Sequence, residues 1–255
     1  MFKKLSLLTI ICLFVWNFPS FAQSVEEIVN KNIEARGGME KLKALNSMKF
    51  TGKMTMPMQQ GLQGPIVVYS KRPNYIRVEF TIQGMTGVQA YDGQTPWMIM
   101  PFMGSKDPQK MSEEDAKDII EQADFDGPLV DYKGKGNTVD LIGKEDLEGT
   151  PVYKLKVTLK SGELRYFFLD AENYLDLKIT RTTKREGNEL TVDTFLGDYK
   201  EVNGLMVPYS VEARIGDKVA NQLAWDSIEF EVPIDDNIFK MPTAESPQSQ
   251  TTPSN

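Results

Sequence analysis

The 255-residue chain contains no histidine and a single cysteine, Cys12. Cys12 lies in the opening segment MFKKLSLLTIICLFVWNFPSFA, which joins two lysines, an apolar run and the small residues Ser20 and Ala22. This is the pattern of a secretory signal peptide, so we expect residues 1–22 to be removed after Ala22. A mature chain without histidine or cysteine excludes Ser–His–Asp and Cys–His catalysis, disulfides and the usual zinc sites.

Long hydrophobic runs and positive charge are also scarce. After the opening segment, no stretch approaches the ~18 apolar residues of a membrane span. The 29 Lys and Arg residues are outnumbered by 36 Asp and Glu, and the net charge of −7 becomes more negative without Lys3 and Lys4. Such an acidic chain gains little from phosphate backbones, so we expect no nucleic-acid partner. We also expect no cofactor and no metal, and a soluble monomer in the periplasm.

The remaining sequence reads mainly as β-strands joined by turns. Met48, Phe50, Met54 and Met56 alternate with polar residues, and Asn203-Gly204 is a strong hairpin signal. We predict about ten or eleven antiparallel strands in meander order with two or three helices, a mainly β, α+β fold. Residues 23–242 form a single domain in this prediction. Residues 243–255, rich in Ser, Thr, Gln and Pro, are expected to be a disordered tail.

Three helices are indicated by their caps and spacing. Ser24 and Glu27 form a capping box before a helical apolar pattern, and a short second helix is predicted after Gly37-Gly38. Gly104–Gln109 reads as a break, after which Ser112 caps a third helix that is expected to end at Gly127-Pro128.

The third predicted helix has a narrow apolar stripe and a strongly acidic opposite face. The stripe consists of Ala116, Ile119, Ile120 and Ala123. A helix of this kind is expected to lie over a surface rather than inside a core. The acidic face is interpreted as solvated; it consists of Glu113, Glu114, Lys117, Asp118 and Glu121.

The stretch from Lys71 to Phe102 carries the most specific motifs. It combines Lys71-Arg72-Pro73-Asn74 with alternating Ile76, Val78 and Phe80, and continues through Asp92-Gly93, Thr95, Trp97 and Pro101-Phe102. Over these roughly 30 residues the chain resembles the LolA family of periplasmic lipoprotein carriers. The capped N-terminal helix and the Phe239–Pro242 ending resemble that family as well.

The resemblance implies a fold and a set of site residues. It implies an unclosed antiparallel β-barrel, a half-barrel, whose concave face holds lipoprotein acyl chains under a helical lid. Arg72 falls at the family arginine that latches the lid. The expected lipid-binding residues are Ile76, Val78, Phe80, Trp97, Ile119 and Ile120. The implied partners are lipoprotein acyl chains or other lipids, an inner-membrane donor and an outer-membrane acceptor protein.

Methionine is concentrated in the same part of the chain. Ten of the 13 methionines lie between Met39 and Met111. Each one alone is ordinary core filler, but the flexible thioether suits irregular apolar guests, so the set favours a pocket.

Three classes of function stay open on the sequence alone. A lipid or lipoprotein carrier agrees with export, with the lack of catalytic residue types and with the lidded sheet. A sensing module of the same fold, which reads a lipid or lipoprotein without transporting it, fits the same features. A carboxylate-based enzyme needs two carboxylates that face one cleft, and the sequence shows no such pair.

Overall fold

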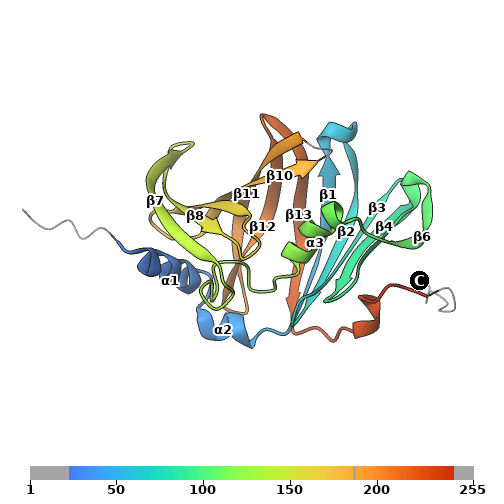
Figure 1. Ribbon diagram of the computed structural model, residues 1–255, viewed down its shortest axis with the longest axis horizontal. Helices are drawn as coiled ribbons and strands as arrows, with labels where there is room; N and C mark the ends of the chain where they lie inside the picture. The colour runs from blue at the N-terminus through green and yellow to red at the C-terminus, as the bar shows by residue number, and fades with distance from the viewer. Residues whose placement is uncertain (1–22, 186–187, 244–255) are drawn as a thin grey trace, which may run out of the picture.

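The computed structural model describes residues 23–185 and 188–243, and these form one large curved sheet with three short α-helices. The sheet has 13 antiparallel strands and does not close, which confirms the mainly β half-barrel with a helical lid (Figure 1). The predicted signal peptide and nearly all of the predicted tail lie outside the described residues.

The elements follow one another with short connections, except around α3. The helices are α1 (Val25–Ala35), α2 (Met39–Ala44) and α3 (Glu113–Gln122), with 3-10 turns η1 (Pro57–Gln59), η2 (Pro101–Met103) and η3 (Asp236–Ile238). The strands are β1 (Ser47–Met56), β2 (Leu62–Lys71), β3 (Tyr75–Ile82), β4 (Met85–Asp92), β5 (Pro96–Met100), β6 (Ser105–Lys110), β7 (Thr138–Leu147), β8 (Thr150–Thr158), β9 (Leu164–Asp170), β10 (Asp176–Arg185), β11 (Asn188–Val202), β12 (Leu205–Ile215) and β13 (Lys218–Phe230).

The strand order places α3 across the open side of the sheet. The order is β6-β5-β4-β3-β2-β1-β13-β12-β11-β10-β9-β8-β7, so neighbours in space are neighbours in sequence except at the β1–β13 pair. The two edge strands are therefore β6 and β7, which are consecutive in the chain. Residues 111–137 must cross from one edge to the other, and α3 lies on this crossing, in front of the sheet in Figure 1.

Two local predictions are wrong. Gly104–Gln109 is not a break, because residues 105–110 pair with β5 as an edge strand, with Met98 opposite Gln109. The polar sequence and Pro108 suggest a loop, but an edge strand tolerates both, since one side makes no ladder bonds. The third helix ends at Gln122 rather than at Gly127. The sheet also has more strands than predicted.

The predicted helix caps are confirmed. The Ser24 Oγ accepts a hydrogen bond from the Glu27 N–H at 3.1 Å, and the Ser112 Oγ accepts one from the Asp115 N–H at 3.1 Å. The short second helix is present as α2. These contacts are local, so the sequence spacing alone fixes them.

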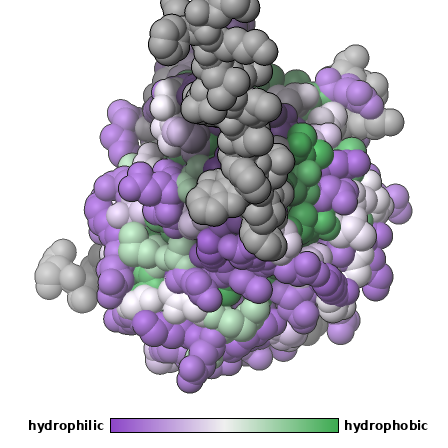
Figure 2. All heavy atoms as spheres, turned by 90° about the vertical axis from the view of Figure 1, so that its left-hand side faces the viewer, coloured by the Kyte–Doolittle hydropathy of each residue, from purple (hydrophilic) through white to green (hydrophobic). Residues whose placement is uncertain are grey.

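The main core lies between the concave face of β8 and β9 and the helices α1 and α2. Ile28 and Val29 of α1 pack there with the fully buried Leu155, Val157 and Leu169. Figure 2 shows the side of the molecule that carries α1 and β7, where hydrophilic residues predominate and hydrophobic residues form separate patches. The half of the concave face that β8 and β9 form is therefore filled by side chains of α1 and α2.

A polar cluster is buried where α1 meets the sheet. Asn32 is fully buried, and its Oδ1 has no hydrogen-bond partner within the described residues. The same holds for Oδ1 of Asp176, although the Tyr199 hydroxyl donates to the Asp176 backbone carbonyl at 2.7 Å. Burial raises the pKa of the Asp176 carboxyl, and the nearby Arg36 charge and Asn32 only partly oppose this. The carboxylate is therefore destabilising at neutral pH.

We expect Asp176→Asn to stabilise the protein by about 1–2 kcal/mol at pH 7, because the amide removes a buried charge and supplies a donor. A carboxyl with a raised folded-state pKa costs stability as the pH rises above its ordinary value. The gain should therefore vanish below pH ~4. Thermal unfolding of both proteins at several pH values measures this. Asp198→Asn, a change at an exposed carboxylate on β11, is the control and should have little effect. Equal stability of Asp176→Asn and wild type at pH 7 would contradict the argument.

Candidate functional site

An apolar cavity of about 380 Å³ lies between the sheet and the lid helix α3. It is formed by β1, β2, β3, β12 and β13, with α2 and the residues around the end of α3 closing it. The lining residues are Arg36, Leu42, Leu45, Met48, Phe50, Val68, Ser70, Ile76, Gln122, Phe125, Asp126, Leu205, Met206, Val207, Pro208, Val211, Leu223, Trp225 and Phe230.

Strand alternation brings these apolar side chains to one face. Phe50 of β1 is opposite Val68 of β2, and Val68 is opposite Val78 of β3. On the other side of β1, strand β13 contributes Trp225, whose ring centroid lies 5.3 Å from that of Phe50. Because side chains alternate between the two faces of a strand, the residues that precede and follow Val68 and Val78 in sequence point to the convex face.

The lid helix packs on this face through its apolar stripe. Ile119 is 2% exposed and, with Ala123, forms a cluster with Ile76 and Tyr91 of the sheet. Met111, just before the helix, packs against the same cluster. The lid therefore covers the half of the concave face that α1 leaves free.

Arg72 joins the corner between β2 and β3 to the segment that follows the lid helix. Its guanidinium donates to both carboxylate oxygens of Asp126, at 2.6 and 2.9 Å. It also donates to the backbone carbonyls of Leu42 at 3.0 Å and Leu45 at 2.5 Å, and lies 4.5 Å from the Phe125 ring centroid. One guanidinium thus ties α2, the sheet corner and the end of the lid together. Its role as a latch stays a prediction.

The electrostatics of this corner follow from its burial. Burial alone raises the pKa of the Asp126 carboxyl, but the hydrogen bonds and charge of Arg72, with help from Lys43, outweigh it and hold the pKa below its ordinary value. The hydrogen bonds with Asp126 in turn raise the pKa of Arg72. The Asp126 side chain is only 7% exposed and that of Arg72 is 25% exposed. The pair therefore stays ionised near neutral pH.

The acidic face of the lid helix is not simply solvated, which corrects the sequence interpretation. Glu121 accepts two hydrogen bonds from Arg165 of β9, and Asp118 accepts two from Arg181 of β10. These strands belong to the opposite half of the sheet, which the sequence could not place beside the helix. The lid is therefore fastened on both sides: by apolar contacts to β3 and β4, and by ion pairs to β9 and β10.

The predicted site residues divide into two groups. Of these residues only Ile76 lines the cavity, whereas Ile119 and Val78 belong to the apolar cluster through which the lid packs on the sheet. Phe80 lies on the same strand face but is not among the lining residues. Its ring packs 5.6 Å from that of Phe102, beside Gly87, where a Cβ would come within 2.9 Å of the Phe80 ring.

Trp97 and Ile120 do not contribute to the cavity. Trp97 is opposite Ala90 in the register, on the convex face, where it is fully buried and donates from Nε1 to the Phe239 carbonyl at 2.7 Å. Phe239 and Met241 of the C-terminal segment pack against Trp97, and no sequence pattern near Trp97 indicates this contact. Ile120 is 42% exposed, because residues one apart on a helix point about 100° apart, so only Ile119 faces the sheet.

The methionine-rich stretch contributes less than its composition suggests. Met48 lines the cavity and Met111 packs beneath the lid. In contrast, Met58, Met85 and Met103 are exposed at hairpin tips, and Met103 is 77% exposed. The cavity instead takes much of its lining from β12 and β13. The sequence shows the alternating apolar residues of these strands, but it does not show that β13 lies beside β1.

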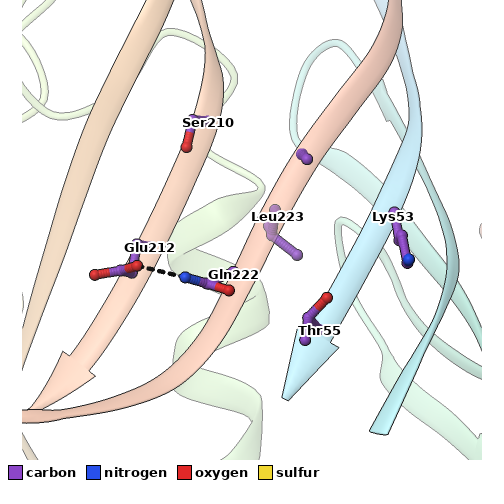
Figure 3. A pocket seen from close by; sticks show the side chains of 7 residues that line it. Lys53, Thr55, Ser210, Glu212, Gln222 and Leu223 are labelled. Carbon is purple, nitrogen blue, oxygen red and sulfur yellow. Dashed lines mark hydrogen bonds between the residues drawn. The ribbon is translucent and has the colours of Figure 1, made fainter. Parts of the chain in front are cut away.

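A second hollow, of about 250 Å³, lies on the convex face over β1, β12 and β13. Figure 3 shows Lys53, Thr55, Ser210, Glu212 and Gln222 around it, with the green helix behind the strands. Glu212 accepts a hydrogen bond from Gln222 at 2.6 Å. Its polar lining, in contrast to that of the concave cavity, does not suit an apolar ligand.

Neither metal ligation nor membrane-spanning helices are found in the part of the chain that the structure describes. Residues 23–185 and 188–243 contain no group of three or more acidic, histidine or cysteine side chains placed to hold a metal ion. Across the same residues, no helix is long and apolar enough to cross a bilayer.

Comparison with solved structures shows the same fold in proteins of low sequence identity. A LolA superfamily protein from Nitrosomonas europaea is 16% identical with a TM-score of 0.57, over 86% of this chain and 98% of the other. A domain from Vibrio parahaemolyticus, described as an outer membrane lipoprotein-sorting protein, is 14% identical with a TM-score of 0.57, over 84% and 94%. A DUF1329 family protein from Desulfovibrio piger is 13% identical with a TM-score of 0.60, over 85% and 97%.

The chain therefore has a LolA-like fold, and the resemblance of Lys71–Phe102 is confirmed at the level of the fold. No protein-family model matches the sequence, and no curated protein gives a significant match. Because these identities are so low, the likeness concerns architecture, and the function is argued from the cavity and its lid.

Proposed function

We propose that this protein is a non-catalytic carrier that binds the acyl chains of lipoproteins or other lipids beneath α3 and ferries them toward the outer membrane. The observation that carries the proposal is the apolar cavity between the concave face and the lid helix. Most of its lining is aliphatic or aromatic, and its only charged lining residues are Arg36 and Asp126, the partner of Arg72. A cavity of this chemistry favours hydrocarbon over polar ligands.

The size of the cavity supports a lid that moves. At about 380 Å³ it lies near the lower end of the ~300–1,000 Å³ found for ligand pockets. Cargo with several acyl chains needs more space than this closed state offers. Lifting α3 would enlarge the cavity and expose Ile76 and its neighbours, so we propose that Arg72 and the lid's ion pairs set the balance between closed and open states.

We propose export to the periplasm as part of this function, with a donor in the inner membrane and an acceptor in the outer membrane. The segment on which export depends lies outside the described residues. If it is a cleaved signal peptide, the mature chain begins at or near Gln23 and carries no acyl group. Sequencing the N-terminus of the protein purified from its own cells tests this; retention of residues 1–22, or an acylated Cys12, would contradict it.

Native mass spectrometry of the protein from its own periplasm tests the proposed function. We expect a bound acyl lipid or lipoprotein that remains with the folded protein. Incubation with acceptor vesicles should then transfer this cargo. Retained lipid without transfer would indicate a sensing module instead, and a protein that neither carries lipid nor takes up an acyl probe would contradict the proposal.

A further inference from the structure

Two arginines face each other on adjacent strands beneath the lid. Arg165 of β9 is directly opposite Arg181 of β10. Arg165 is also opposite Val157, a residue of the concave-side core, so the pair points to the concave face. Like charges directly opposite each other destabilise a sheet, and Arg165 is only 4% exposed. The two arginines therefore need anionic partners to offset their mutual repulsion.

The lid supplies most of these anions. Asp118 and Glu121 lie three residues apart, on one side of α3, and each binds one arginine through two hydrogen bonds. Glu163 is a further carboxylate, 3.2 Å from Nη2 of Arg165. Within the described residues, Arg181 has no carboxylate partner other than Asp118. Charge neutrality at the pair thus depends on the closed lid.

Opening the lid would remove both carboxylates from the arginines. A guanidinium as buried as Arg165 is costly without a full set of partners, and only Glu163 and the Leu164 backbone carbonyl would remain beside it. The apolar cavity reaches the same turn of α3, because Gln122, which follows Glu121, is one of its lining residues. An anionic group attached to an acyl chain in the cavity can therefore reach the arginines when the lid lifts.

We propose that Arg165 and Arg181 form a binding site for the phosphate or carboxylate group of an acyl lipid, which Asp118 and Glu121 occupy in the closed state. This rests on the proposed acyl-chain binding and adds the chemical class of the ligand. Arginine suits this role because its planar fork binds phosphate and carboxylate through paired hydrogen bonds. Cargo binding and lid closure then compete for the same two side chains.

The test compares the affinities for phosphatidylglycerol and phosphatidylcholine with identical acyl chains. In wild type, phosphatidylglycerol should bind more tightly. Neutralising the lid with Asp118→Asn and Glu121→Gln removes the competing anions, so the preference for phosphatidylglycerol should rise by about tenfold. Arg181→Gln should lower that preference by about tenfold, whereas a change in the lid's open–closed balance alone would shift the affinities for both lipids together. Opposite shifts from these variants are the signature of competition.

Controls separate this proposal from its alternatives. Arg214→Gln removes an arginine of comparable exposure that pairs with Glu212 and Glu148, and should leave the preference unchanged. If both lipids bind and no variant changes the preference, the ion pairs only hold the lid, and acyl binding stands without the anion site. Inorganic phosphate that binds as tightly as phosphatidylglycerol would assign the site to a free anion. Binding of neither lipid would overturn acyl-chain binding itself.

Discussion

Arg72→Leu is expected to lower the free energy of unfolding by about 3 kcal/mol and to speed hydrogen exchange across α3. The substitution leaves Asp126 buried without its main partner and removes the donors to the backbone carbonyls of Leu42 in α2 and Leu45 just after it. Removal of one member of a buried ion pair costs about 3–5 kcal/mol, and the partial exposure of Arg72 argues for the lower end. Denaturant unfolding and exchange mass spectrometry over residues 112–127 measure the two effects.

A double variant tests whether the unpaired charge on Asp126 causes the loss of stability in Arg72→Leu. The double variant Arg72→Leu, Asp126→Leu should lose less stability than Arg72→Leu alone, because no unpaired carboxylate remains. Arg72→Lys keeps the charge but not the fork, so it should fall between wild type and Arg72→Leu. Destabilisation with unchanged exchange in α3 would show that Arg72 braces the corner without controlling the lid.

The same ion pair has a defined pH dependence. The pKa of Asp126 is lower in the folded state than its ordinary value. Its contribution to stability is therefore present at neutral pH and is lost as the pH falls through the lowered pKa. In Arg72→Leu this acid-dependent loss should shrink, because the interaction that lowers the pKa is gone.

Val68→Glu is expected to weaken binding of an acyl probe by about a hundredfold or more while the protein remains folded. Val68 lines the cavity, so hydrocarbon bound there would have to desolvate an unpaired carboxylate, at a cost of several kcal/mol. The empty cavity can admit water, so the cost to folding should be smaller. Probe titration and thermal unfolding report binding and folding separately.

Val67→Glu is the matched control, because the residue type and the strand are the same and Val67 points to the other face. It lies opposite Thr51 and Glu79, and Glu79 is already paired with Arg77. Val67→Glu should therefore retain the probe with an affinity close to that of wild type. If the two variants weaken binding equally, or if Val68→Glu does not fold, the concave face is ordinary core rather than a binding surface.

Much of the local structure could be predicted from the sequence. The serine caps of α1 and α3 depend on contacts three residues apart, and the strand pattern depends on a period of two. These features predicted that Ile76, Val78 and Phe80 share a face and that Ile119 belongs to the packed side of the lid helix. Family resemblance added the position of Arg72, whose partners lie far away in the chain.

The parts of the site that sequence reasoning missed all depend on contacts between distant segments. A period of two says which residues share a face, but not which face is concave, so Trp97 was assigned to the cavity although the C-terminal segment covers it. The solvated interpretation of Asp118 and Glu121 is wrong for a similar reason. Nothing near α3 in the chain indicates that β9 and β10 bring two arginines beneath it.

By itself, the sequence determined most of the strands, the hairpins, the capped helices and the absence of histidine chemistry, because each depends on composition or on neighbours a few residues apart. Tertiary structure alone decided that β13 pairs with β1. This pairing makes β6 and β7 the two edges, sends the connection between them across the concave face, and so creates both the lid and the cavity beneath it. Pairing between strands so far apart is set by packing of the whole sheet, for which no local pattern carries a signal.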